Sequence, residues 1–301
     1  MTPRAAGAPQ PPAMHRRPAQ KYGDVMEITP VSSGVGANVA DVDLRTLTAD
    51  DHAQIESAWA DYGVLFFRNQ TLTPEEHLSF SERFAPADIN KFFGTVEGHP
   101  AIAEVRKEPN QTKNIGGGWH ADHTYDLAPA RGSILLARET PATGGDTMFA
   151  DAAAAYDALS PAMQEMLEGL RAMHTNVDVF GPESISAREM SDRFGNADQA
   201  TNTVIHPVVI RHPQSGRKVL FVNPGFTRHF EGWTKAESRP LLKQLYAHIG
   251  SPIFTTRFRW EPGSIAMWDN RRVWHWALND YDGQRRVMHR VTIQGEELAA
   301  A

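Results

Sequence analysis

The sequence predicts a mainly β fold with helical insertions, arranged as a jelly-roll barrel. From about residue 102, short strand-like segments follow one another at close spacing. Two helical segments, 152–170 and 234–249, interrupt this series. The opening of the chain combines helices with one strand but does not continue as repeated βαβ units. The 301-residue chain has no internal repeat and no Gly-Ser linker, so we expect residues 23–301 to form a single domain.

The opening elements are predicted from local signals. Residues 48–62 carry apolar side chains at helical spacing, and Gly63 follows as a stop signal. Four consecutive apolar residues, 64–67, predict a buried strand. Thr73-Pro74-Glu75-Glu76 combines a capping box with proline at the first helical position, so a second helix runs to about residue 84.

The later segments predict the strands of the barrel and the starts of its helical insertions. His212-Pro213-Gln214-Ser215-Gly216 is typical of a hairpin turn between two strands. Ser160-Pro161, and Thr234 three residues before Glu237, are helix start signals. The predicted strands are 102–106, 133–138, 147–150, 206–211, 218–222, 253–258, 264–268 and 286–294.

The composition excludes several classes of protein and site. No run of about eighteen apolar residues is present, so we expect no membrane partner. The formal charge is −6 with both signs interspersed, which argues against a nucleic-acid partner. Without cysteine there is no disulfide, thiolate metal ligand or cysteine nucleophile, and a cytoplasmic enzyme fits. Residues 1–22 predict a flexible tail rather than a secretory signal. We also expect a homo-oligomer, either a dimer or a tetramer.

The segment Trp119-His120-Ala121-Asp122-His123 is the most informative short stretch. If it is extended, alternate side chains share a face, so His120 and Asp122 point together and His123 points away. With His275 as a third ligand, they match the two-histidine, one-carboxylate triad of non-haem iron oxygenases. Taken alone, the His-x-Asp pattern also fits a surface turn, and a histidine between tryptophans also fits a packed core residue.

Two arginines follow His275 and lie four positions apart. On a strand, positions 286, 288 and 290 share one face, so Arg286 and Arg290 would project into the barrel with Met288 between them. Interior arginines are costly unless they pair with anions. The alternative is an ordinary salt-bridged strand on a solvated face. Beside a metal triad, the anion-binding interpretation is favoured.

At this point the chain resembles the taurine and alkylsulfonate dioxygenase family, which includes the aryloxyalkanoate dioxygenases. The resemblance covers about residues 25–296. Several motifs in the same order are more specific than any one of them. The resemblance implies a double-stranded β-helix, the jelly-roll core of 2-oxoglutarate oxygenases. The motifs are Trp119-His120-x-Asp122, Gly144-Gly145-Asp146-Thr147, Trp268-Asp269-Asn270, His275 followed by Arg286 and Arg290, Ser215-Gly216-Arg217-Lys218 and Phe221-Val222-Asn223.

The resemblance implies a reaction and a role for each matching residue. The reaction is an Fe(II)- and 2-oxoglutarate-dependent dioxygenation, in which O2 is consumed and succinate and CO2 are released. Thr147 and Arg286 match the pair that binds the 2-oxoglutarate carboxylate distal to the iron. Arg290 matches an arginine near the substrate anion and the iron-side carboxylate. The residues that match the iron ligands are His120, Asp122 and His275.

The carboxylate among the metal ligands distinguishes hydroxylating enzymes of the wider class from halogenating ones. Halogenating relatives of the wider class lack this group, whereas Asp122 is present here. The resemblance therefore implies hydroxylation of the substrate.

The substrate pocket departs from that of the taurine enzyme. Asn90 aligns with a histidine that helps bind the sulfonate there, Phe93 aligns with a tyrosine, and Gly116 aligns with an asparagine. The sequence therefore predicts a small organic anion other than taurine. An aryloxyalkanoate or another carboxylate, an alkylsulfonate and an alkyl sulfate ester remain open. One candidate substrate contact is Arg290, which could instead pair only with an acidic side chain. The other candidates, each of which could instead be a packing or exposed residue, are Asn90, Lys91, Phe92, Phe93 and Trp119.

Two other classes of function fit part of the pattern. Two histidines, an aspartate and a water also suit Zn2+, so a zinc-dependent hydrolase is one alternative. A zinc-dependent hydrolase would give no role to Thr147, Arg286 and Arg290. A non-catalytic jelly-roll binding protein is the other alternative, but the three metal ligands are all intact.

Overall fold

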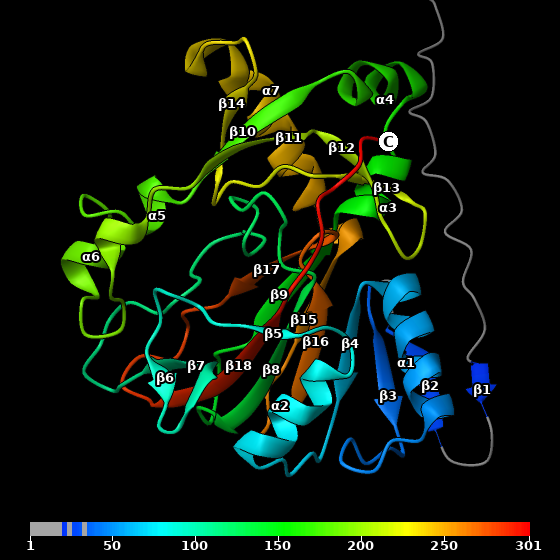
Figure 1. Cartoon of the computed structure of the whole chain (residues 1–301), viewed down its shortest axis with the longest axis vertical. Coiled ribbons are helices and arrows are strands. Elements are labelled where there is room, and N and C mark those ends of the chain that lie inside the picture. The colour runs from blue at the N-terminus through cyan, green and yellow to red at the C-terminus, as the bar shows by residue number, and fades with distance from the viewer. Residues whose placement is uncertain (1–19, 23–25, 32–34) are drawn as a thin grey trace, which may run out of the picture.

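The computed structural model describes residues 20–22, 26–31 and 35–301, and its centre is a barrel of two facing sheets (Figure 1). The larger sheet has ten strands. In spatial order they are β1 (Gln20–Tyr22), β2 (Met26–Pro30), β3 (Ala37–Ala40), β4 (Val64–Phe67), β16 (Ile265–Asp269), β8 (Gly132–Glu139), β18 (Arg286–Ile293), β7 (His99–Lys107) and β6 (Thr95–Val96), with β5 (Ala87–Asp88) paired to β18.

The smaller sheet faces the larger one across an apolar interior. It consists of β15 (Thr255–Phe258), β9 (Thr147–Asp151) and β17 (Val273–Ala277). Phe66 of the larger sheet stacks on Phe258 of the smaller one with 4.3 Å between ring centroids. The same buried cluster contains residues of both sheets, which confirms the predicted jelly-roll barrel.

Helical segments and short strands surround the barrel. Outside the smaller sheet lie the three-stranded sheet β11 (Thr203–Pro207), β10 (Arg171–Thr175), β14 (Thr227–Phe230) and the hairpin β12 (Val209–Arg211), β13 (Lys218–Leu220). In chain order, the helical segments of the described residues are α1 (Ala49–Tyr62), α2 (Pro74–Glu82), α3 (Ala152–Asp157), α4 (Pro161–Glu168), α5 (Val177–Phe180), α6 (Ile185–Glu189), η1 (Ala197–Gln199), α7 (Lys235–Ile249) and η2 (Pro252–Phe254).

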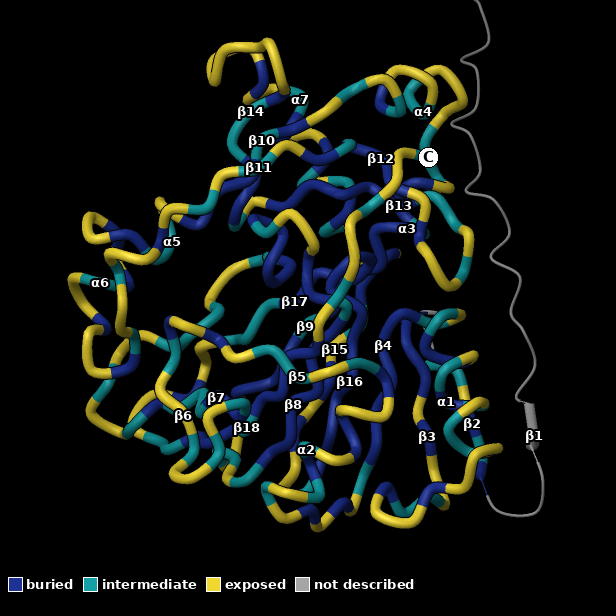
Figure 2. The backbone as a smooth tube through the Cα atoms, in the orientation of Figure 1, coloured by how far each residue is buried: buried dark blue, intermediate teal, exposed yellow. Residues whose placement is uncertain are grey.

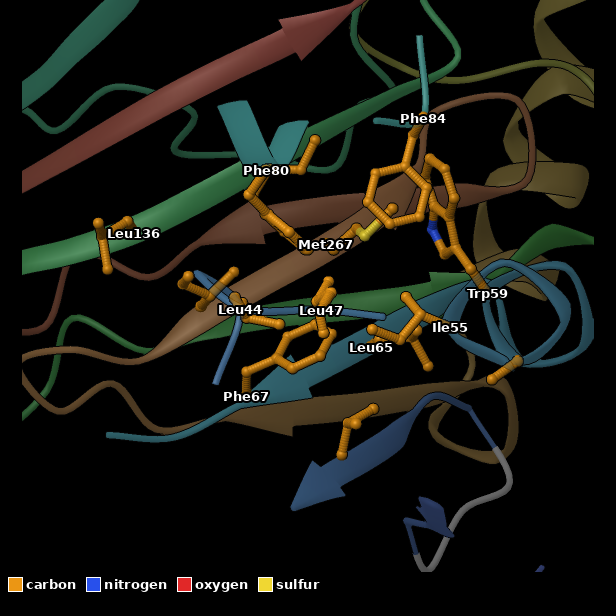
Figure 3. Packing of buried hydrophobic residues seen from close by; sticks show 14 of the residues in the cluster. Leu44, Leu47, Ile55, Trp59, Leu65, Phe67, Phe80, Phe84, Leu136 and Met267 are labelled. Carbon is orange, nitrogen blue, oxygen red and sulfur yellow. The ribbon is translucent and has the colours of Figure 1, made fainter. Parts of the chain in front are cut away.

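Helices α1 and α2 cover the outer face of the larger sheet (Figure 3). Thr48 and Thr73 cap these helices, and both halves of each capping box are present. Phe67 leaves β4 on the outer side and meets Phe80 of α2 edge to face. Phe66 leaves the same strand on the inner side because successive side chains alternate. The central strands β4, β16, β8 and β18 are consequently buried on both faces along most of their length (Figure 2).

A second apolar cluster lies outside the smaller sheet, among α3, α7 and the hairpin β12–β13. The predicted turn at 212–216 joins this hairpin, with Gly216 at φ 66°. The predicted capping box at Thr234 opens α7. The barrel therefore lies between two layers that contain helices.

The structure differs from the sequence predictions in several insertions. The predicted helix 152–170 is wrong as one element, because Ser160 caps a new helix that begins at Pro161. The predicted strand 206–211 divides at Val208 between β11 and β12, which pair with different strands. The predicted strand 253–258 begins as η2. The sequence did not predict β2, β3, β5, β6, β10, β14, β17, α5, α6 or η1.

The predicted tail lies mostly outside the described residues. Residues 1–19 are not among them, whereas residues 20–22 form β1 and pair with β2. No helix of the described part of the chain is long and apolar enough to cross a membrane.

Candidate metal and cosubstrate site

Three potential metal ligands converge inside the barrel. His120, Asp122 and His275 each offer one ligand atom, and these atoms lie within 4.8 Å of one another. The Nε2 atoms of His120 and His275 lie 3.6 and 3.7 Å from carboxylate oxygens of Asp122. Two imidazoles and one carboxylate at these separations fit iron(II). Among the described residues, no other group of three His, Asp or Glu side chains could hold a metal ion.

Backbone pairing brings the two histidines together. His120 and His275 form an isolated antiparallel bridge with N···O distances of 3.1 and 2.8 Å. His275 lies on β17, opposite Phe149 of the neighbouring β9. The Nδ1 of His120 donates to the carbonyl oxygen of Gly118 at 2.8 Å. This bond fixes the proton on Nδ1 and leaves Nε2 free to bind a metal.

Charge and burial favour the protonation states that bind a metal. Burial alone would raise the pKa of Asp122, but Arg290 and the two histidines hold it well below its usual range. Burial, together with the nearby His120, lowers the pKa of His275 well below its ordinary value. The group therefore offers a carboxylate and a neutral imidazole at neutral pH.

A buried arginine and a buried hydroxyl group both contact Trp260. The Nε1 of Trp260 donates to Thr147 Oγ1 at 2.9 Å, and Arg286 lies over the Trp260 ring with its Cζ 5.8 Å from the centroid. Arg286 Nε donates to the carbonyl oxygen of Gly145 at 3.1 Å. Its Nη2 has no hydrogen-bond partner among the described residues. Burial lowers the pKa of Arg286, but an arginine remains charged at neutral pH.

The second arginine lies between the metal group and an aromatic ring. Arg290 Nη1 donates to Asp122 at 2.9 Å, and its guanidinium carbon lies 4.5 Å from the centre of the Phe93 ring. Arg286, Met288 and Arg290 are all at most 5% exposed, and Met288 packs in the barrel interior. The predicted shared face of positions 286, 288 and 290 therefore points inward.

Aromatic side chains gather beside Arg290, and we call them the aromatic wall. Phe92 stacks on Phe180 at 4.5 Å between centroids, and Phe93 packs against Phe194 at 4.9 Å. Tyr125 meets Phe180 edge to face at 6.2 Å. The wall consists of Phe92, Phe93, Tyr125, Phe180 and Phe194.

The other candidate substrate residues separate into different environments. Asn90 is buried and lies next to His123, with 3.3 Å between Asn90 Nδ2 and His123 Nε2. Lys91 is exposed. Trp119 packs against Trp274 and Trp276 in the layer outside the smaller sheet, because it alternates with His120 along the chain. Trp119 is therefore a packing residue and is not part of the proposed pocket.

The local geometry after Ala121 was only partly predicted. The segment is extended up to Ala121, but Asp122 and His123 lie in a turn, and His123 has φ 58°. His123 is not part of the metal group, as predicted. Its hydrogen bonds to Asn90 and Asp126 were not predicted.

Two further features of the site had no clear sequence signal. Trp260 was not singled out, because a tryptophan beside strand 253–258 looks like any core residue. Phe180 and Phe194 pack against Phe92 and Phe93, although more than eighty residues separate the members of each pair in the sequence. Contacts between distant segments leave no local pattern.

The comparisons with known proteins agree with this geometry. Residues 27–292 match the family model described as "Taurine catabolism dioxygenase TauD, TfdA family". The chain belongs to this family. It is 33% identical over 276 residues to an alpha-ketoglutarate-dependent sulfate ester dioxygenase of Pseudomonas putida, with 90% of each chain covered. It is 32% identical over 279 residues to an (S)-phenoxypropionate/alpha-ketoglutarate-dioxygenase of Sphingobium herbicidovorans, covering 90% of this chain and 95% of that one.

A solved structure of this family also has the same fold. The putative alpha-ketoglutarate-dependent taurine dioxygenase of Burkholderia xenovorans superposes with a TM-score of 0.78 at 34% identity, and 91% of each chain is covered. The TauD-family chain described here is an Fe(II)- and 2-oxoglutarate-dependent dioxygenase that uses O2. This activity sets aside the zinc hydrolase and the non-catalytic binding protein.

Proposed function

We propose that this dioxygenase hydroxylates a small organic anion held by Arg290, with release of succinate and CO2. The main support for this proposal is the burial of Arg290 and its incomplete hydrogen bonding. Its guanidinium is buried beside the metal group and uses only Nη1 for Asp122. Its Nε and Nη2 are buried and have no hydrogen-bond partner in the described part of the chain. A buried cation with free N–H groups is costly unless an anion binds them.

In this proposal His120, Asp122 and His275 hold iron(II) through two Nε2 atoms and a carboxylate oxygen. A triad of this kind would leave the metal able to take further ligands. When bound, iron with 2-oxoglutarate and O2 would supply the oxidative decarboxylation that drives hydroxylation of a substrate C–H bond. The chain's own task is to keep the triad in place and to orient the two organic molecules.

Arg286 and Thr147 bind the distal carboxylate of 2-oxoglutarate. Because Trp260 donates to Thr147 Oγ1, the hydroxyl hydrogen of Thr147 is free to be donated to a carboxylate. The bond from Arg286 Nε to Gly145 fixes the plane of the guanidinium, so that its unpartnered Nη2 faces the ligand. The two donors then set the direction in which 2-oxoglutarate reaches the metal.

Arg290, Asn90 and Phe93 form the substrate pocket. Arg290 supplies the charge that recognises the head group, and the aromatic wall supplies apolar surface for an alkyl or aryl body. This combination suits an alkyl sulfate, alkylsulfonate or aryloxyalkanoate better than the small zwitterion taurine. The names of two relatives, a sulfate ester dioxygenase and an (S)-phenoxypropionate dioxygenase, support anions of this kind.

The test is a screen for succinate formation with iron(II), ascorbate and 2-oxoglutarate. Alkyl sulfates, alkylsulfonates, aryloxyalkanoates and taurine are compared with neutral alcohols of the same carbon skeleton. At least one anion should stimulate succinate release clearly above taurine, and its neutral analogue should not. Equal stimulation by anions and neutral analogues, or efficient taurine turnover, would contradict the proposal.

A further inference from the structure

A chain of polar side chains runs from the substrate pocket to the segment that carries α5. Asn90 Nδ2 lies 3.3 Å from His123 Nε2, and His123 Nδ1 lies 2.9 Å from Asp126 Oδ2. The other oxygen of Asp126 accepts from the side chain of Asn202, and Asn202 is bonded through its backbone to Asn176. We call Asn90, His123 and Asp126 the amide relay.

The hydrogen-bond donors and acceptors of the relay can be ordered in only one way. Asn90 Oδ1 accepts from the backbone N–H of Phe92 at 2.9 Å, so the amide nitrogen must face His123. An amide nitrogen only donates, hence His123 Nε2 is the acceptor. The His123 proton is then on Nδ1 and is donated to the carboxylate of Asp126. The second N–H of Asn90 has no acceptor among the residues that the structure describes.

The backbone of the relay is held in an uncommon conformation. His123 has φ 58°, in the left-handed region that residues other than glycine seldom adopt. A turn bond from Asp126 N to the His123 carbonyl oxygen, at 3.0 Å, closes this segment. His206 Nε2 donates to the Asp126 carbonyl oxygen at 2.9 Å. Such a conformation persists where the surroundings hold it, and it often occurs at functional sites.

The relay lies beside the proposed substrate head group. His123 directly follows Asp122, which is bonded to Arg290. Phe93, three residues after Asn90, packs on the Arg290 guanidinium. Strand β5, which leads into Asn90, pairs with residues 292–293 of β18, just beyond Arg290. Asn90 is therefore carried to the end of β18 where Arg290 projects inward.

We propose that Asn90 presents its free amide N–H to the substrate head group and that His123 and Asp126 are positioning residues that fix this orientation. This inference rests on the proposed function and adds a determinant of substrate specificity. Arg290 supplies one charge, and the amide supplies a neutral donor in a fixed direction. A singly charged oxyanion with at least two acceptor oxygens, such as a sulfate ester, sulfonate or carboxylate, fits this pair.

The first experiment determines the tautomer of His123 without any substrate. Long-range 15N–1H spectra of the full-length chain loaded with diamagnetic Zn2+ report the protonated nitrogen of each histidine. The His123 signals are assigned by their loss in His123→Phe. The proposal requires the proton on Nδ1 in the unaltered chain and loss of this preference in Asp126→Leu. A proton on Nε2 in the unaltered chain overturns the relay.

The second experiment is a double-mutant cycle on Asn90 and His123, with hexyl sulfate and phenoxyacetate as probe anions. Asn90→Leu and His123→Phe should each raise the KM of the better probe about tenfold, the effect of one lost hydrogen bond. The KM for 2-oxoglutarate should change by less than about twofold. Because His123 acts through Asn90, the double variant should show the same KM as Asn90→Leu alone.

Asp88→Asn is the matched control. Asp88 Oδ2 lies 3.6 Å from His123 Nδ1, so its charge is close to the ring although it makes no hydrogen bond with it. This variant should behave like the unaltered enzyme, whereas Asp126→Leu should repeat the effect of His123→Phe. Additive effects in the cycle, or an equal loss with Asp88→Asn, overturn the positioning role. If no anion stimulates succinate release by the unaltered enzyme, both the proposed function and the specificity claim are wrong. The tautomer of His123 can still be measured in that case, and it tests the hydrogen bonds of the amide relay independently.

Discussion

The two faces of β18 are both largely buried but differ in chemistry. On the outer face, Val291 and Ile293 pack into the apolar cluster beneath α2. On the inner face, Arg286 and Arg290 are at most 5% exposed, and both retain nitrogen atoms without a partner among the residues described. One strand thus contributes to a closed apolar layer and to an interior that carries unpaired positive charge.

The difference between the two faces of β18 indicates that one contributes to the stability of the fold and the other to ligand binding. Apolar side chains under a helix stabilise the fold through burial, and their removal leaves a cavity. A buried cation without a full set of partners costs free energy, and it is retained here beside a metal group and a hydroxyl that also face the interior. The outer face should therefore control unfolding, and the inner face should control ligand affinity.

The largest expected difference is between Arg286 and its neighbour Val287. Arg286→Leu should raise the KM for 2-oxoglutarate about 30-fold or more, because a desolvated carboxylate that loses its partner costs about 2–5 kcal/mol. The free energy of unfolding without ligand should stay equal or rise. Val287→Ala should lower the free energy of unfolding by about 1–2 kcal/mol and leave this KM unchanged.

Steady-state kinetics and urea unfolding of the two variants measure both quantities. The contrast between the two faces is refuted if Arg286→Leu binds 2-oxoglutarate normally. It is equally refuted if Val287→Ala alters the KM as strongly as it alters stability.

A smaller effect is expected at Arg290. Arg290→Leu removes charge-assisted hydrogen bonds worth about 1.5–3 kcal/mol, so the KM for the preferred organic anion should rise about tenfold to a hundredfold. The KM for 2-oxoglutarate should rise less. Val291→Ala, one residue further on the outer face, is the control and should affect unfolding only. An unaltered KM for the anion in Arg290→Leu would leave Arg290 as a partner of Asp122 alone.

The smallest effect concerns the one buried histidine of α2, on the outer side. Burial lowers the pKa of His77 from 6.5 to about 3, helped by the positive charge of Arg138. The folded protein therefore keeps His77 neutral while the unfolded chain binds a proton below about pH 6.5. The contribution of His77 to stability is complete above this pH and is lost as pH falls towards 3.

Urea unfolding at about pH 7.5 and about pH 5.5 measures this contribution. His77→Leu should lose about 1 kcal/mol less stability between the two pH values than the unaltered chain loses. An identical pH dependence of both proteins would show that His77 is protonated in the folded state.

The barrel and the inner face of β18 could be predicted because their signals are local. The capping boxes at Thr73 and Thr234 are complete within four residues. The alternation of Arg286 with Arg290 follows from the geometry of one strand. Residue patterns of this kind can be recognised without knowing which strands are neighbours.

The surroundings of the site could not be predicted, because they are built by contacts between distant segments. Trp260 donates a hydrogen bond to Thr147, which lies 113 positions earlier in the sequence. Phe180, which belongs to a different insertion, stacks on Phe92. The amide relay depends on the turn at His123, whose positive φ is unusual for a histidine. Trp119 was one of the candidate substrate contacts, but it packs against Trp276 outside the smaller sheet, which is the alternative that the sequence had left open.

The most direct test of the account is to locate iron in crystals. Crystals grown without O2, with iron(II) and 2-oxoglutarate, can be measured by anomalous diffraction at the iron absorption edge. The account predicts one iron about 2.1 Å from His120 Nε2, an Asp122 carboxylate oxygen and His275 Nε2. The carboxylate of 2-oxoglutarate distal to the metal should contact Arg286 and Thr147. Iron bound elsewhere, or iron that lacks one of these three ligands, would contradict the account.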